Sequence, residues 1–319
     1  MTKMITTNLM SALMPLIMGA CSCNSSSQQP SQTTRSHDTT TTMSQATQQE
    51  PQEDKSQVLY LNMHSKILNA NIPYTVYLPP SFSKDKMTKY PILYLLHGMA
   101  DDNKCWIQRG KLQTTADELI KSGKMREMVI VTPLAGSLKL QTEWNGYFNM
   151  PGWSYEDFFM KEFMPKMEAD YRVIGDRGHR AVAGLSMGGG AATSFSQRYP
   201  DLFCACYAMS ALMDDAKLPG YKGPNSKVGM LKTSVAKNSC TKFVTNADAA
   251  TKGKLMKIKW YVDCGDKDFL LYRNKEFMAA MDKAGIPYQK KIRPGTHNWQ
   301  FWSSALFTCL PFISNSMAK

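Results

Sequence analysis

The stretch AVAGLSMGGGAA, residues 181–192, places a single hydroxyl among residues that have almost no side chain. Glycine costs conformational entropy, so a cluster of glycines indicates a backbone that turns tightly or passes close to another segment. Gly184, Ser186 and Gly188 form the pattern G-x-S-x-G between a strand-like run and a helical pattern. In that context the pattern predicts a sharp turn that exposes the serine hydroxyl. The alternative, a phosphate-binding loop, needs G-x-G-x-x-G or G-x-x-x-x-G-K, and this stretch contains neither.

Short apolar runs alternate with helical patterns through the rest of the chain. The runs predict eight strands, at residues 58–63, 72–79, 90–98, 128–135, 179–186, 203–211, 258–265 and 288–295. The later runs are nearly continuous, which is typical of parallel strands that are covered on both faces. Helices are expected near residues 112–122, 155–169, 188–199, 273–284 and 298–310. We therefore predict an α/β fold, a mostly parallel sheet of about eight strands with helices on both faces, whose ligand site lies at the carboxyl ends of the strands.

A serine hydroxyl is a weak nucleophile and needs a base that a carboxylate orients. His297, in PGTHNWQFW, follows the last predicted strand and precedes the final helix. His97 competes for this role, because His97, Asp101 and Ser186 would follow a different order of histidine, acid and serine. A serine on a strand-to-helix turn goes with the order serine, acid, histidine, which favours His297. We expect His64 and His179 to be surface or turn residues.

The acid should follow the penultimate strand, in WYVDCGDKDFLL. Asp263, Asp266 and Asp268 are all available there. Asp263 still lies within the strand, and spacing alone does not decide between the other two. The oxyanion that forms when serine attacks a carbonyl needs two backbone donors, and the amide after the serine, Met187, is expected to be one of them.

Four motifs occur in a fixed order over most of residues 58–315: LLHGMADDNKCW, GLSMGG, CGDKDFLL and PGTHNW. Together they resemble the esterase D group of α/β-hydrolases, which includes feruloyl and acetyl-xylan esterases, S-formylglutathione hydrolases, siderophore esterases and mycolyltransferases. The resemblance implies the α/β-hydrolase fold and ester hydrolysis. It also implies that the acid is the last residue of C-G-x-x-D, which is Asp268, and that the second oxyanion donor is the residue after His-Gly, which is Met99.

Two further segments are candidates for contact with a substrate. TEWNGYFNMPGW contains Trp144, Tyr147 and Trp153, and two interpretations are equally consistent with it: an acyl or sugar platform, and a loop packed on the domain by its own aromatics. Trp299 and Trp302 are expected in the core. The lysine-rich segment 212–257 has no sheet pattern and is predicted to form a lid or substrate loop.

The chain begins with a pattern that predicts export. Residues 1–20 have one lysine, a short apolar run and then small residues, as in a signal sequence. Cleavage before Cys21 would resemble bacterial lipoprotein processing, although Met18 stands where leucine is usual; an ordinary secretory signal is the alternative. Residues 21–57, rich in Ser, Thr and Gln, are predicted to be a disordered tether before an esterase domain at residues 58–319.

Charge and cysteine content exclude several other classes. The net charge is +12, but the lysines are scattered, which favours a solvated surface over a nucleic-acid site. No C-x-x-C pair occurs, so no zinc site is predicted, and we predict neither a metal nor a cofactor. Six cysteines of the domain are expected to be free buried thiols, with a disulfide between Cys105 and Cys240 left open.

The prediction is therefore an exported bacterial serine carboxylesterase, in the periplasm or on the cell surface, that hydrolyses feruloyl or acetyl esters of plant polysaccharides such as xylan. A siderophore esterase and an acyltransferase of the same family are alternatives. From another class, a surface carbohydrate-binding lipoprotein without activity would lack a member of the triad, whereas serine, acid candidates and histidine are all present.

Overall fold

The computed structural model describes residues 55–136 and 145–319. All eight predicted strands are confirmed within a few residues of their expected bounds, and they form one sheet. The strands are β1 (Gln57–Ser65), β2 (Ala70–Leu78), β3 (Ile92–Leu96), β4 (Val129–Pro133), β7 (Arg180–Leu185), β8 (Ala205–Met209), β9 (Lys259–Gly265) and β10 (Gln289–Arg293). Two short strands, β5 (Asn149–Met150) and β6 (Trp153–Ser154), pair separately.

The order of strands in the sheet is β1-β2-β4-β3-β7-β8-β9-β10. β2 runs antiparallel to both β1 and β4, whereas all other neighbouring pairs are parallel. The carboxyl ends of β3, β7, β8, β9 and β10 therefore lie along one edge of the sheet. Segments that are far apart in the sequence meet at this edge, because each follows one of these neighbouring strands.

The central strands are buried on both faces, as their continuous apolar runs predict. In β3, Ile92, Tyr94 and Leu96 belong to the core on one face, and Leu93 and Leu95 belong to the core on the other. Side chains alternate between the two faces of a strand, so a strand covered by helices on both sides needs apolar residues at every position.

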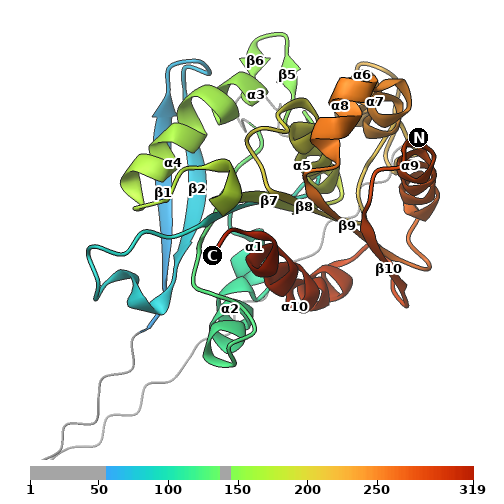
Figure 1. Ribbon diagram of the computed structural model, residues 1–319. Helices are drawn as coiled ribbons and strands as arrows, with labels where there is room; N and C mark the ends of the chain where they lie inside the picture. Colours follow the sequence, from blue (N-terminus) through green and yellow to red (C-terminus); the bar gives the residue numbers. More distant parts are fainter. Residues whose placement is uncertain (1–54, 137–144) are drawn as a thin grey trace, which may run out of the picture. The chain divides into compact units, whose positions relative to one another are not determined.

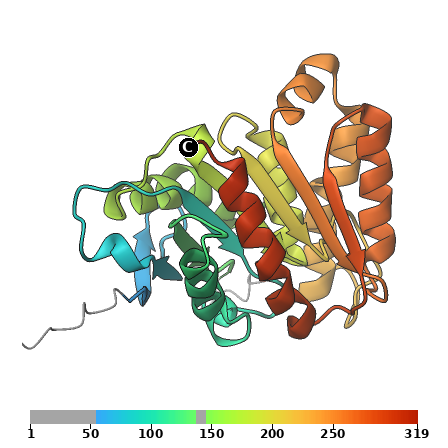
Figure 2. The ribbon, with the colours of Figure 1, turned by 60° about the horizontal axis from the view of Figure 1, so that its bottom comes forward.

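Helices cover both faces of the sheet (Figure 1). One face carries α3 (Tyr155–Phe158), the π-helical turn η2 (Phe159–Phe163), α4 (Met164–Asp170), α5 (Met187–Arg198), α6 (Lys227–Lys237), α7 (Cys240–Asn246), α8 (Ala249–Leu255) and α9 (Leu271–Ala284). The other face carries α1 (Cys105–Gln108), α2 (Leu112–Lys121) and α10 (Trp299–Ser316). Figure 2 shows α10 crossing this second face. Two short 3-10 turns, η1 (Pro80–Phe82) and η3 (Arg177–His179), complete the elements. The predicted α/β-hydrolase architecture is confirmed.

The segment 212–257 differs from the prediction in part: residues 212–226 form a loop as expected, but three helices, α6, α7 and α8, follow it. Serine and aspartate cap these helices: the side chains of Ser226, Ser239 and Asp248 each accept a hydrogen bond from a first-turn amide. The short apolar faces of the helices complete the core over the sheet. The sequence pattern of these helices is weak, because α7 and α8 have only seven residues each and the buried face of α6 includes Gly229 and Ser234.

Ser56 and Gln57, which precede the predicted start of the domain at residue 58, also contact it. Ser56 Oγ donates a hydrogen bond to Asp117 Oδ2 on α2 over 2.8 Å, and Gln57 pairs with Leu78 in the sheet. The predicted export signal, Cys21 and nearly all of the tether lie outside the described residues. Among the described residues, no helix has both the length and the apolar content needed to cross a membrane.

Candidate active site

Ser186 occupies the sharp turn that the glycine pattern predicts. It lies between the end of β7 and the start of α5, with φ 51° and ψ −117°, a conformation that costs energy for any residue with a Cβ atom. A Cβ atom on Gly188 would lie 2.5 Å from the His97 carbonyl oxygen, and one on Gly184 would lie 2.5 Å from the backbone of Gly188. The glycines are therefore needed for close approach of the backbone, which confirms the predicted crowding of the turn.

The backbone of Ser186 is held on both sides. Its amide donates to Met209 O at the end of β8 over 2.9 Å, and its carbonyl accepts from the amides of Leu212 (2.9 Å) and Gly190 (3.1 Å). These hydrogen bonds offset the strain of the turn and hold the side chain in one position.

His297 lies in the loop between β10 and α10, and its Nε2 is 2.9 Å from Ser186 Oγ. The loop ends at Asn298, whose side chain caps α10 by accepting from the Phe301 amide over 2.9 Å. The imidazole lies between two aromatic side chains, with ring centroids 4.5 Å from Phe269 and 4.9 Å from Trp302. Trp302 therefore contacts the imidazole as well as the core, and it donates from Nε1 to Ser210 Oγ over 3.2 Å.

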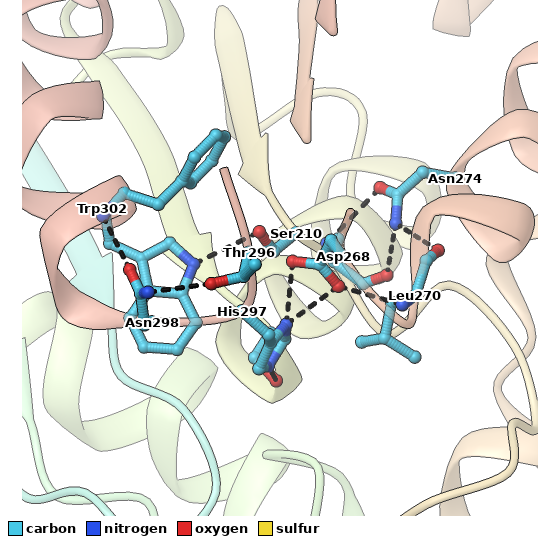
Figure 3. Close-up of polar contacts among 11 residues, drawn as sticks. Ser210, Asp268, Leu270, Asn274, Thr296, His297, Asn298 and Trp302 are labelled. Atoms are coloured by element: carbon cyan, nitrogen blue, oxygen red, sulfur yellow. Dashed lines mark hydrogen bonds and ion pairs between the residues drawn. The ribbon is translucent and has the colours of Figure 1, made fainter. Parts of the chain in front are cut away.

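Of the three aspartates after β9, the structure brings Asp268 to the imidazole. Its two carboxylate oxygens lie 3.0 and 2.9 Å from His297 Nδ1, and the side chain is fully buried (Figure 3). Asp266 is exposed and accepts from the Gly295 amide over 3.0 Å, which links the two loops. Asp263 is buried and pairs with Arg293 and with the Tyr207 hydroxyl.

A buried asparagine, which the sequence analysis did not identify, connects the loops of the site. Asn274 on α9 donates from Nδ2 to the carbonyls of Ala211 and Leu270, each over 2.9 Å, and its Oδ1 accepts from the Ala211 amide over 3.3 Å. The Leu270 amide in turn donates to Asp268 Oδ1 over 2.8 Å (Figure 3). Asn274 thus joins the segment after β8 to the loop that holds Asp268. An isolated polar residue in a helix carries no local signal of such contacts.

His97 is buried and its ring is engaged by the backbone, so it is not available as the base. Its Nε2 accepts from the Ala135 amide over 3.0 Å, and its Nδ1 donates to Gly98 O over 2.7 Å, so both ring nitrogens have backbone partners. Burial lowers the pKa of His97 to about 4. The other two histidines are as expected: His64 contacts Asn71 on the β1–β2 hairpin, and His179 pairs with Asp176 at a turn.

Both predicted oxyanion residues lie at the serine. Met187 is the first residue of α5, so its amide has no partner within the helix. Met99 follows Gly98, where an added Cβ atom would lie only 3.5 Å from Ser186 Cβ. Met99, Ser186 and Met187 line the same cleft.

This cleft has a volume of about 160 Å³ and is mainly apolar. Its walls include Leu212, Leu218, Pro219 and Leu231 as well as the two rings that flank His297, and the helical segment 212–257 provides these four aliphatic residues. The prediction that this segment contributes to a substrate site agrees with this position: Leu212, Leu218 and Pro219 lie in the loop that precedes α6, and Leu231 lies on α6 itself.

The aromatic segment favours the packing alternative over the substrate platform. Tyr147 is 0% exposed and Trp153 is 1% exposed, and both belong to the core. The Tyr147 hydroxyl donates to His97 O over 3.0 Å and accepts from the His97 amide over 2.8 Å, so it supports the loop that leads to Met99. A platform needs accessible side chains, so we do not assign these two to substrate. Trp144 lies outside the described residues.

The cysteines of the described residues are free and buried, and burial raises the pKa of each thiol. Cys105 and Cys240 belong to cores on opposite faces of the sheet, so they do not form the disulfide that the sequence left open. Within residues 55–136 and 145–319, no cluster of three or more His, Cys, Asp or Glu side chains is arranged to hold a metal ion.

Comparison with known proteins adds to this geometry. Residues 65–313 match the Esterase family model, described as "Putative esterase". A solved structure of a ferulic acid esterase is 53% identical, with a TM-score of 0.80, and the match covers 82% of this chain and 99% of that one. An acetyl esterase of Caldicellulosiruptor saccharolyticus is 23% identical over 277 residues, which cover 81% of this chain and 98% of that protein.

An endo-1,4-beta-xylanase/feruloyl esterase of Xylanibacter ruminicola is 25% identical over 248 residues. The match covers 76% of this chain but only 29% of the longer protein. The chain therefore spans less than a third of that relative.

Proposed function

The chain belongs to the Esterase family of α/β-hydrolases and is a carboxylic ester hydrolase, and from this premise we propose that it hydrolyses feruloyl or acetyl esters of plant polysaccharides through Ser186, His297 and Asp268. The observation that carries the proposal is the continuous chain of hydrogen bonds from Asp268 through His297 to Ser186 Oγ. The three residues come from three separate loops, and no local feature of the backbone requires them to meet.

In the first step, Ser186 Oγ attacks the ester carbonyl carbon while its proton passes to His297 Nε2. The bond between the carbonyl carbon and the alcohol oxygen then breaks, and Nε2 gives its proton to that oxygen as the alcohol leaves. Water attacks the resulting acyl-enzyme in the same way, and the acid is released as the proton returns to Oγ. Asp268 holds Nδ1 as the protonated nitrogen, which leaves Nε2 free to accept, and it stabilises the imidazolium that forms.

The negative charge that develops on the carbonyl oxygen needs donors that are already in position. We assign this role to the backbone amides of Met99 and Met187, two residues that line the cleft together with Ser186. The loss of one such donor typically raises the barrier by about 3–4 kcal/mol. Tyr147 and Gly98 support the position of Met99, so their contribution to the reaction is indirect.

The apolar cleft beside Ser186 supports an aromatic or short acyl group. Its small volume and its lining by Leu218, Leu231 and Phe269 suit a planar ring or an acetyl group. Among the relatives, the 53% identical structure is a ferulic acid esterase, which favours a feruloyl over an acetyl substrate.

The enzyme is proposed to act outside the cytoplasm, because residues 1–20 have the pattern of an export signal and a cell-wall polysaccharide is an external substrate. Cys21 is proposed as a lipid anchor. Labelling of cells with a radioactive fatty acid should mark the wild-type protein and should not mark the Cys21→Ser variant.

The test of the activity compares the wild type with Ser186→Ala on four substrates: an aryl acetate, methyl ferulate, acetylated xylan and a catecholate siderophore ester. We expect turnover of methyl ferulate or acetylated xylan by the wild type, and loss of at least about 10³-fold in kcat in the variant. Equal turnover by both proteins would exclude Ser186 as the nucleophile. Preference for the siderophore ester would replace the polysaccharide substrate with the alternative.

A further inference from the structure

A second and larger cleft lies between the β1–β2 hairpin and the segment at residues 100–109. Its volume is about 800 Å³, and we refer to it as the hairpin cleft. Asp101 lines both the hairpin cleft and the cleft at Ser186, so the two are neighbours on the surface. A substrate with its carbonyl carbon at Ser186 can therefore extend into both.

We propose that the hairpin cleft binds the saccharide on the alcohol side of the ester, as a neutral sugar chain. This inference rests on the proposed function, since it assigns the two sides of the scissile bond to two different clefts. The acyl group would occupy the apolar cleft of about 160 Å³, and the much larger alcohol would occupy the cleft of about 800 Å³.

The wall formed by β1 presents an aromatic side chain to solvent. Tyr60 is 49% exposed although it is a large apolar residue on an edge strand, and the neighbouring Leu61 is 37% exposed. Lys104 Nζ, from the opposite wall, lies 5.7 Å from the centroid of the Tyr60 ring. The C–H face of a sugar ring is apolar and packs against an aromatic ring, whereas its hydroxyls need polar partners at the edge. The Tyr60 ring offers the apolar surface, and Lys104 Nζ beside it offers a polar partner for the hydroxyls.

The charges of the hairpin cleft favour a neutral ligand. Its charged residues are Asp101, Asp102, Lys104 and Arg109, two of each sign. This balance differs from that of the whole chain, whose net charge is +12. A site for an anionic polymer would show an excess of basic residues, and this cleft does not. The polar groups that remain, including the exposed amide of Gln108, can donate to and accept from hydroxyls.

The junction between the two clefts is formed by an ion pair. Arg109 pairs with Asp101, and its guanidinium packs 4.9 Å from the centroid of the Trp299 ring. The Asp101 side chain is 8% exposed and that of Arg109 is 51% exposed, so the carboxylate of the pair is buried and the guanidinium is accessible to a ligand. Arginine has five N–H donors in a rigid plane, and the half-exposed guanidinium of Arg109 can offer those that do not contact Asp101 to sugar hydroxyls.

The test compares two substrates with the same acyl group, methyl ferulate and a feruloylated arabinoxylo-oligosaccharide. Tyr60→Ala removes the aromatic ring, Tyr60→Phe keeps it, and Gln108→Ala alters the opposite wall. Phe307→Ala is the matched control, because Phe307 is 46% exposed on α10 and does not line the hairpin cleft. Circular dichroism and thermal unfolding establish that each variant is folded.

We expect the ratio of kcat/KM for the oligosaccharide ester to kcat/KM for methyl ferulate to fall about tenfold in Tyr60→Ala, which corresponds to about 1.4 kcal/mol. Tyr60→Phe should keep most of the ratio, Gln108→Ala should lower it about threefold, and Phe307→Ala should not change it. If Tyr60→Ala does not fold, Gln108→Ala carries the test by itself.

An unchanged ratio in the folded cleft variants would overturn the inference, while hydrolysis of both esters by the wild type would leave the proposed function standing. Hydrolysis of neither ester by the wild type would instead overturn the proposed function, and the assignment of the cleft with it. If Tyr60→Ala or Gln108→Ala lowers kcat/KM more for an oligosaccharide ester that carries uronic acid than for the neutral ester, the cleft selects an anionic sugar. That result would contradict the neutral ligand proposed.

Discussion

Replacement of Asp268 by asparagine keeps the size of the side chain but changes which of its atoms donate hydrogen bonds. In the structure, Oδ1 accepts from the Leu270 amide over 2.8 Å, and both oxygens face His297 Nδ1. The oxygen of the asparagine will take the Oδ1 position, because the Leu270 amide needs an acceptor. The new NH₂ group then faces Nδ1, which must become an acceptor in turn.

This change reverses the tautomer of His297. If Nδ1 accepts, the proton lies on Nε2, which is 2.9 Å from Ser186 Oγ and can no longer take its proton. The equivalent change in a Ser-His-Asp enzyme lowers kcat about 10⁴-fold, which is about 5 kcal/mol in activation free energy. KM should change little, since Asp268 is fully buried and does not line the cleft at Ser186.

The assay measures kcat and KM on methyl ferulate for Asp268→Asn and for the matched control Asp266→Asn. Asp266 is exposed, and the oxygen of an asparagine can still accept from the Gly295 amide, so we expect a loss of less than about threefold. Thermal unfolding shows whether both variants keep the fold. More than a tenth of wild-type kcat in folded Asp268→Asn would refute the role of Asp268, and a large loss in Asp266→Asn alone would assign that role to Asp266.

Three other predictions follow from buried groups. Asn274→Leu leaves the carbonyl of Leu270 without its side-chain donor, so urea titration should show a loss of about 1–3 kcal/mol in unfolding free energy. The kcat should fall at least about tenfold at unchanged KM, because the loop that holds Asp268 loses a support. Wild-type values for both quantities would contradict the linking role of Asn274. His97 has a folded pKa of about 4, below the usual value of about 6.5, so the unfolded state binds the proton first as the pH falls. The contribution of His97 to the free energy of unfolding should be fully present above about pH 6.5 and should fall by up to about 3 kcal/mol towards pH 4. The unfolding free energy of His97→Asn should decline less over this range, and equal declines in the wild type and the variant would refute the prediction. Burial raises the pKa of Cys204 to about 11 and that of Cys206 to about 12, so a thiol reagent should modify these cysteines only after denaturation, as counted by mass spectrometry.

Much of the fold could be predicted because its signals are local. A strand buried on both faces needs a nearly continuous apolar run: β3 and β8 have one throughout, and the runs of β4, β7 and β9 are interrupted only by a few polar residues. Helices α6, α7 and α8 were not predicted, because the apolar face of each is narrow and is completed only by its neighbours in the core.

The environment of side chains was harder to predict than the path of the backbone. For Tyr147 and Trp153 the sequence left open a substrate platform and a packed loop; both residues are buried, and the sequence does not say which side of a loop faces the core. Asn274 shows the same limit, since its contacts are to residues 211 and 270, which only the packing of α9 brings near.

The sequence by itself determined that Ser186 lies on a sharp turn between a strand and a helix, because crowding of the backbone there restricts the residue types at adjacent positions. Residue spacing left Asp266 and Asp268 open, and only the resemblance to a known family implied Asp268; the tertiary structure shows the physical reason that Asp268 faces His297. Asp266 and Asp268 follow the same strand, and one of them lies at the imidazole because the loops after β9 and β10 pack against each other. Contacts across a sheet depend on the order of its strands, and no short stretch of sequence contains that order.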